Sequence, residues 1–191
     1  MKILLGIIVV VAVAVGAFFF WFRLDVLEAD AFTISHPRGV EVEVGSDLSG
    51  GFISPSIVKL SYSKEAFNAE GTNFSEAYLV IGKSVGKDSA AECTQFNDIQ
   101  NGEPVIAKEE VINEEVFSAA DTVGAAAGNR YHSRLYRTLH EGACYEIALT
   151  VHTSNIDNYP EGTVEEFNSA QAFIVLEQIF RTFEFKNNEA L

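Results

Sequence analysis

A long uncharged run near the N-terminus constrains this chain more than any other part of its sequence. Residues 3–22 contain only aliphatic, aromatic and glycine residues. At about 1.5 Å per residue, a helix of this length spans the roughly 30 Å hydrocarbon core of a bilayer. Lys2 precedes the run, and an aromatic belt at residues 18–21 precedes Arg23. The run predicts a single-pass transmembrane anchor, residues 1–23, with its N-terminus in the cytoplasm and the rest of the chain outside.

Two other interpretations of the same run are open. The charged start and the small residues Ala12, Ala14 and Gly16 also suit a cleaved signal peptide. Cleavage there leaves residues 18–22 as an exposed apolar end, and the run exceeds the roughly 7–15 residues of a signal core. The other alternative is a buried helix of a cytoplasmic protein. We expect an uncleaved signal anchor, whose partner is the lipid bilayer through residues 3–22.

Composition limits what the remainder of the chain can bind. The formal net charge is −14, and nearly all of it follows the apolar run. Such a surface is repelled by phosphate backbones, so we expect no nucleic-acid partner. We interpret residues 24–30 as an acidic linker, residues 31–186 as one extracytoplasmic domain and residues 187–191 as a tail.

The two cysteines of the chain agree with an exported domain. Cys93 and Cys144 belong to no CxxC or metal-type spacing. In an oxidising compartment the default for such a pair is one structural disulfide. We therefore expect a Cys93–Cys144 bond, with two buried free thiols as the alternative.

The best-defined local unit is a hairpin late in the chain. Residues 131–140 and 143–153 are strand-like and flank Glu141-Gly142, which is a two-residue turn signal. A two-residue loop sets Arg137 opposite Glu146, and the opposite charges support that register. The alternate residues of the second arm then form one apolar face.

A helix is expected after this hairpin. The segment 163–166 has the sequence of a capping box, and apolar residues recur at helical spacing from Ala172 to Phe183. A last strand is expected near residues 183–185, and a shorter helix at residues 88–96. The order of these elements predicts an α+β fold, an antiparallel sheet covered by helices and preceded by the single N-terminal transmembrane helix.

Two short segments resemble the PsbP-like fold. Phe32-Thr33-Ile34-Ser35-His36-Pro37 looks like its first strand and turn, and residues 176–185 (LEQIFRTFEF) are similar to its closing helix and strand. With the paired central strands, the resemblance covers about residues 31–186. Members of that fold are mostly non-catalytic accessory or assembly proteins outside a membrane, so the resemblance implies binding rather than catalysis. The matched segments contain no site motif, so the resemblance assigns no functional residue to this chain.

One loop has the composition of a calcium site. Asn155, Asp157, Asn158 and Glu161 place oxygen ligands within a few residues, as calcium sites do. Their spacing is not that of an EF-hand loop, and Asn and Asp also favour turns. We expect a plain turn with no metal and no cofactor, and keep calcium as the alternative.

Catalytic residues are not expected. A triad of Ser133, His152 and Glu146 can be written from the hairpin register, but no nucleophile elbow or glycine-rich oxyanion loop supports it. The function that we predict is a membrane-anchored, extracytoplasmic, non-enzymatic binding or assembly module, whose partner is another envelope protein. The alternatives are a membrane-tethered hydrolase or metal-dependent enzyme, and a structural subunit of an envelope complex.

Overall fold

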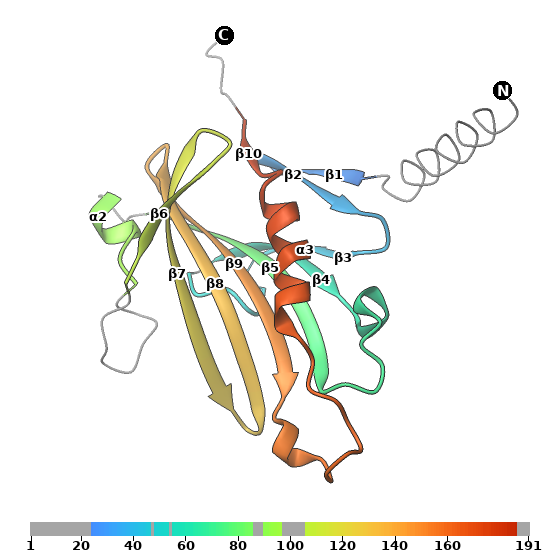
Figure 1. Cartoon of the computed structure of the whole chain (residues 1–191). Coiled ribbons are helices and arrows are strands. Elements are labelled where there is room, and N and C mark those ends of the chain that lie inside the picture. Colours follow the sequence, from blue (N-terminus) through green and yellow to red (C-terminus); the bar gives the residue numbers. More distant parts are fainter. Residues whose placement is uncertain (1–23, 47, 54, 86–89, 97–105, 187–191) are drawn as a thin grey trace, which may run out of the picture.

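Two antiparallel sheets and one long helix make up the part of the chain that the structure describes (Figure 1). The structure is a computed structural model, and it describes residues 24–46, 48–53, 55–85, 90–96 and 106–186. The strands are β1 (Leu24–Glu28), β2 (Phe32–Pro37), β3 (Glu41–Val44), β4 (Ser56–Tyr62), β5 (Phe74–Val85), β6 (Lys108–Ile112), β7 (Glu115–Ala126), β8 (Asn129–His140), β9 (Ala143–Ser154) and β10 (Glu184–Phe185). The helical segments are α2 (Ala90–Cys93), α3 (Ser169–Phe180) and the 3₁₀ turns η1 (Lys64–Phe67) and η2 (Ile156–Asn158).

Tight hairpins build half of the large sheet, whose strand order is β3-β4-β5-β9-β8-β7-β6. From β6 to β9, each strand is joined to the next by two residues that both have positive φ: Asn113-Glu114, Ala127-Gly128 and Glu141-Gly142. This is the type I′ turn, whose twist matches that of the flanking strands. The predicted register of the last hairpin is confirmed, because Arg137 pairs with Glu146.

One face of the large sheet, called here the helix face, carries α3 and the small sheet β1-β2-β10 (Figure 1). The odd-numbered residues of β9 from Ala143 to Val151 all belong to its apolar cluster, as predicted. The helix adds five buried residues at the predicted spacing: Ala172, Phe173, Leu176, Ile179 and Phe180. Full burial of one such large apolar side chain stabilises the fold by roughly 1.5–3 kcal/mol, so this cluster is the main core.

The opposite face, called here the loop face, is covered by two segments with little regular structure, residues 48–53 and 90–96. Phe96 belongs to an apolar cluster with Val80 and Leu135 of the sheet. The first segment comes very close to β5, because a Cβ atom at Gly82 would lie 2.9 Å from the carbonyl oxygen of Ile53. Central strands β5 and β9 are therefore buried on both faces.

The predicted fold class is wrong. The structure is 54% strand and 14% helix, and α3 is the one long helix among the described residues, so this is a mostly β fold rather than an α+β sheet covered by helices. Glu109 and Glu110 belong to strand β6. In the described part of the chain, no helix is long and apolar enough to cross a membrane. The expected anchor, residues 1–23, and the tail, residues 187–191, lie outside the described residues.

Two predicted boundaries also differ from the structure. Residues 24–28, expected as part of a linker, form strand β1 and pair with β2. The long helix begins at Ser169, with Asn168 as its N-cap, rather than at Thr163. The reason is that Glu165 uses its backbone elsewhere: its N–H donates to Gly71 and its carbonyl oxygen accepts from Asn73, each at 3.0 Å. These groups are then not available to a first helical turn.

Candidate functional site

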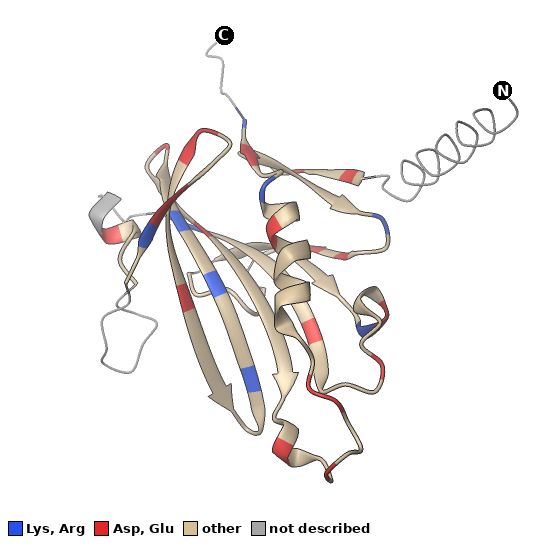
Figure 2. Ribbon diagram, in the orientation of Figure 1, with Lys and Arg blue, Asp and Glu red and all other residues tan. Residues whose placement is uncertain are grey.

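A charged cleft lies between the helix α3 and the strands β6 to β8, on the helix face. Its volume is about 340 Å³. Charged side chains from four elements line it: Lys108 and Glu110 of β6, Asp121 of β7, Arg134 of β8, and Glu177 and Arg181 of α3 and its C-cap. Figure 2 shows acidic and basic positions side by side on these elements. The cleft is therefore locally balanced in charge within a strongly acidic chain.

Arg134 lies at the centre of this cleft. Its Nε lies 3.3 Å from Oδ1 of Asp121, its direct cross-strand partner, and its Nη1 donates to Oε1 of Glu177. The guanidinium carbon lies 4.6 Å from the centre of the Phe173 ring. The side chain nevertheless remains 40% exposed. Arg134 thus links the helix to the sheet while presenting part of its charge to the cleft.

Asn113 connects the turn between β6 and β7 to the C-terminal end of α3. It occupies the left-handed region, with φ of 46°, in the turn between β6 and β7. Its side-chain amide donates to the carbonyl oxygens of Arg181, at 2.8 Å, and Phe183, at 2.9 Å. These bonds satisfy carbonyl groups at the C-terminal end of α3 and fix the edge strand β6 relative to the helix.

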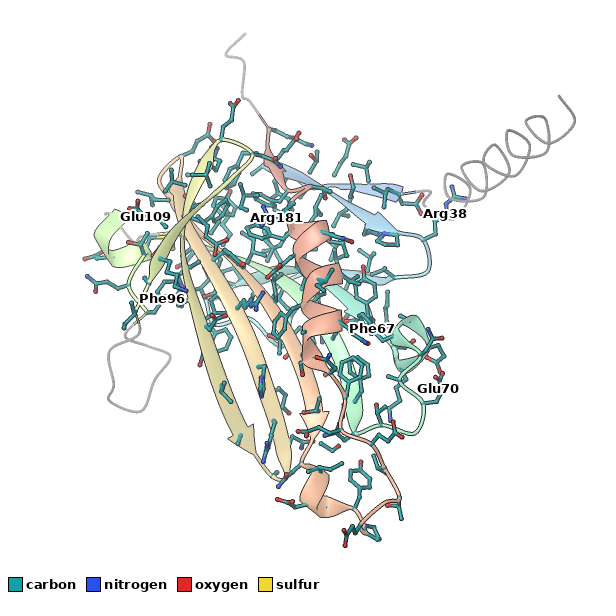
Figure 3. The ribbon with its side chains drawn as sticks, in the orientation of Figure 1. Arg38, Phe67, Glu70, Phe96, Glu109 and Arg181 are labelled. Atoms are coloured by element: carbon teal, nitrogen blue, oxygen red, sulfur yellow. A yellow bond between two sulfur atoms is a disulfide. The ribbon has the colours of Figure 1, made fainter. Side chains whose placement is uncertain are left out.

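Two cations in the cleft have no acidic partner within the described part of the chain. Among the described residues, neither Lys108 nor Arg181 forms an ion pair. Figure 3 labels Arg181 at the upper end of the helix. Burial, followed by the charges of Glu110 and Glu177, raises the pKa of Tyr136 to about 12, so its phenol stays neutral. The cleft therefore offers two cations to an acidic group.

The loop face holds a buried ion pair and the predicted disulfide. Arg137 donates from Nε to Oε2 of Glu146 at 2.8 Å, and the two side chains are 0% and 1% exposed. Oε1 of Glu146 also accepts from the backbone N–H groups of Phe52 and Ile53, at 2.8 and 3.2 Å. Nη1 of Arg137 donates to the carbonyl oxygen of Gln95. The pair thus fastens both covering segments to the sheet.

The Cys93–Cys144 disulfide is present, as predicted. It links α2 to β9 and so fastens the same covering segment, residues 90–96, through a covalent bond. Figure 3 labels Phe96 on this side of the sheet. The guanidinium carbon of Arg137 lies 4.8 Å from the centre of the Phe96 ring. These contacts explain how a four-residue helix is held in place.

The structure does not bring together Ser133, His152 and Glu146, the three residues considered as a catalytic triad. Ser133 shares a hydrogen bond of 2.8 Å with Thr150, and Glu146 belongs to the ion pair with Arg137. His152 instead lies between two other acceptors, Oε1 of Glu76 at 3.4 Å and Oδ1 of Asn129 at 3.0 Å. Each of the three residues thus belongs to a separate hydrogen-bond network.

The candidate calcium loop surrounds η2. Asn155 accepts from the backbone N–H of Asp157 at 3.4 Å, and Asn158 donates to the carbonyl oxygen of Gly128 at 2.9 Å. Asp157 and Glu161 are exposed. In the described ranges, no group of three or more His, Cys, Asp and Glu side chains is placed to hold a metal ion. The Asn158 amide thus fastens the loop to the turn between β7 and β8, and the Asn155 side chain caps η2.

The cleft was not predicted from the sequence because two turns next to it were not recognised. Both Asn113-Glu114 and Ala127-Gly128 are turns, but only the Asn and Gly residues signal this in the sequence. Taking residues 127–128 as a hairpin loop would have set Asp121 opposite Arg134. That pairing of opposite charges is the signal that could have found the centre of the cleft.

Comparison with known proteins adds little to this description. No protein-family model and no curated protein matches the chain. A solved crystal structure of a protein from Bacteroides thetaiotaomicron is similar, with a TM-score of 0.43 and 16% sequence identity. The match covers 82% of this chain and 46% of that protein, so this chain spans less than half of its length. It gives no link to the PsbP-like fold, and that resemblance stays a prediction.

Proposed function

We propose that this chain is a non-enzymatic binding module, held at a membrane by residues 3–22 with its domain outside the cytoplasm. The cleft between α3 and β6–β8 is the site where it holds a partner. The single observation that carries the proposal is the pair of cations, Lys108 and Arg181, that line this cleft without an acidic partner among the described residues.

The disulfide supports the proposed compartment. Disulfides persist outside the cytoplasm and are rare in cytosolic proteins. Cys93 and Cys144 are the only cysteines of the chain, and they are bonded to each other. An exported domain agrees with this pairing and with the apolar run ahead of it.

The lining of the cleft favours a segment of another protein over an apolar small molecule. Small-molecule pockets are mostly apolar and measure about 300–1,000 Å³, whereas this cleft is at the small end of that range and is lined by charges. An acidic side chain of the partner pairs with Lys108 and Arg181. Glu110 and Asp121 on the sheet side repel a segment that is negative throughout, so the segment carries both signs of charge.

Photo-crosslinking in native membranes tests the proposal. We place a photoreactive phenylalanine at Ile106, which is 84% exposed and lines the cleft. The matched control is Val44, which is 68% exposed and lies on β3, the opposite edge of the sheet. The full-length protein is expected to form a discrete adduct with a second protein from position 106 and not from position 44. The absence of an adduct at 106, or equal adducts at both positions, contradicts the proposal.

A further inference from the structure

The first strand begins directly after the apolar run. β1 starts at Leu24 and is paired with β2 along its whole length, so only Arg23 separates it from Phe22, the last residue of the run. At no more than about 3.6 Å per residue, the Cα atom of Leu24 lies within roughly 7 Å of that of Phe22. A domain connected this closely cannot move away from the bilayer that holds the run.

We propose that the outer face of the small sheet β1-β2-β10 is a membrane-contacting surface, on which Leu24 and Val26 lie among the lipid headgroups. This inference rests on the membrane attachment in the proposed function. It adds the orientation of the domain and the side chains that touch lipid.

The register of the small sheet decides which side chains face outward. Leu24 pairs with Pro37 and Val26 with Ser35, so these side chains share one face. The alternate residues of β2, such as Ile34 and His36, point to the core and are buried. On the outer face, Leu24 is 48% and Val26 is 59% exposed. Two large aliphatic side chains are thus presented next to the apolar run.

The polarity of this face changes with distance from the run. Glu28 follows on the same side of β1, about 13 Å from Leu24 at the usual rise of a strand. It lies 3.8 Å from Nζ of Lys186, and Glu184 pairs with the neighbouring Thr33. The end near the run is therefore aliphatic and the far end is charged, as expected for a surface that passes from headgroups into water.

A cation lies at the aliphatic end. Arg38 stands in the turn after β2, and Figure 3 labels it close to the start of β1. Its Nε lies 3.3 Å from Oδ1 of Asp25, and its side chain is 61% exposed. Asp25 holds one edge of this guanidinium from the core side of β1, and the exposed remainder can pair with headgroup phosphate oxygens.

Depth-dependent fluorescence quenching tests the inference on the full chain. Val26→Cys is labelled with an environment-sensitive dye and reconstituted in phosphatidylcholine vesicles with or without brominated acyl chains. The matched control is Val123→Cys, since Val123 is 67% exposed and lies on β7, far from the small sheet. The native cysteines are bonded to each other, so each variant carries one reactive thiol.

The label at position 26 is expected to shift to the blue and to lose emission in brominated vesicles, and the label at 123 to do neither. If both labels are equally exposed to water in a chain that floats with the vesicles, this inference is overturned and the membrane attachment is not. A blue shift that grows with protein density and is not quenched by bromine indicates a second copy and also overturns it. A chain that does not float with the vesicles overturns the membrane attachment itself, and this inference with it.

Discussion

Neighbouring residues of β9 are buried by different means on the two sides of the sheet. On the helix face, Ile147 and Leu149 belong to a large apolar cluster that α3 and the small sheet complete. On the loop face, Cys144 is bonded to Cys93, and Glu146 is paired with Arg137 and two backbone N–H groups. The helix face is held by apolar burial, whereas the cover of the loop face is held mainly by a few directional bonds and one covalent link.

This difference predicts where the molecule is vulnerable. Truncating one side chain of an apolar cluster removes only part of the stabilisation that the cluster provides. Removing one partner of a buried ion pair leaves an unpaired buried charge, which is strongly destabilising. We therefore expect substitutions on the loop face to have effects that depend strongly on whether one or both partners are changed.

The largest effect is expected at Arg137. Arg137→Met leaves Glu146 buried without its cation and is expected to lower the free energy of unfolding by about 3–5 kcal/mol. The double variant Arg137→Met with Glu146→Met is expected to recover much of this loss, because no buried charge remains. Urea denaturation of residues 24–191 measures both.

Arg134 is the matched control for Arg137. It lies on the same strand but on the helix face, and its ion-paired side chain is 40% exposed. Arg134→Met is expected to cost about 0–1 kcal/mol. Similar losses for the two single variants would contradict the distinction between the faces.

A smaller effect is expected from loss of the disulfide. Cys93→Ser with Cys144→Ser opens a loop of 51 residues and is expected to cost about 2–4 kcal/mol. Hydrogen exchange is expected to accelerate first in residues 90–96, while α3 and β9 keep their protection. Equal acceleration in α3 would show that the cover and the main core unfold as one unit.

Alkaline pH is expected to lower the free energy of unfolding through buried tyrosines on both faces of the sheet. Burial raises the pKa of Tyr62 and Tyr136 on the helix face and of Tyr78 on the loop face, the last two to about 12. The unfolded phenols ionise near pH 10, so between about pH 10 and 12 the folded chain binds more protons and its stability falls as pH rises.

The loss is at most about 3 kcal/mol for each of Tyr78 and Tyr136, because a shift of one pKa unit corresponds to about 1.4 kcal/mol. Urea denaturation across this pH range measures it. Tyr78→Phe and Tyr136→Phe are each expected to make the pH dependence shallower. An unchanged slope in Tyr78→Phe would mean that the cover of the loop face does not exclude water from that ring.

The smallest changes in stability are expected from Tyr→Phe substitutions at Tyr62 and Tyr78, and the two changes are expected to have opposite signs. The buried Tyr62 hydroxyl makes no hydrogen bond with any described residue, whereas the Tyr78 hydroxyl bonds to Thr150. Tyr62→Phe is expected to raise stability by about 1 kcal/mol at neutral pH, and Tyr78→Phe to lower it by about the same amount. Thermal unfolding of the two variants checks this, and a loss in Tyr62→Phe would contradict the assignment.

The strands buried on both faces were the most predictable part of the fold. The apolar run of β5 and the turn signal Glu141-Gly142 both reflect local chemistry, so their positions and the Arg137–Glu146 register follow from the sequence. The disulfide followed from the presence of two cysteines in a domain that the apolar run predicts to be exported.

The start of α3 and the fold class were not predictable in the same way. The capping pattern at Thr163 is overridden by the backbone pairing of Glu165 with Gly71 and Asn73, which are distant in sequence. The cleft depends on β6 folding back through Asn113 onto the end of α3, another long-range contact. Periodicity carries no information about such contacts, so the candidate site required the structure.

The central functional claim is that Lys108 and Arg181 hold a partner, and one measurement tests it directly. The double variant Lys108→Ala with Arg181→Ala is combined with the photoreactive residue at Ile106 in the full-length chain. The account predicts that the adduct is lost while the urea midpoint changes little, because neither cation is ion-paired within the described residues. An adduct of undiminished yield in a stably folded double variant would contradict it.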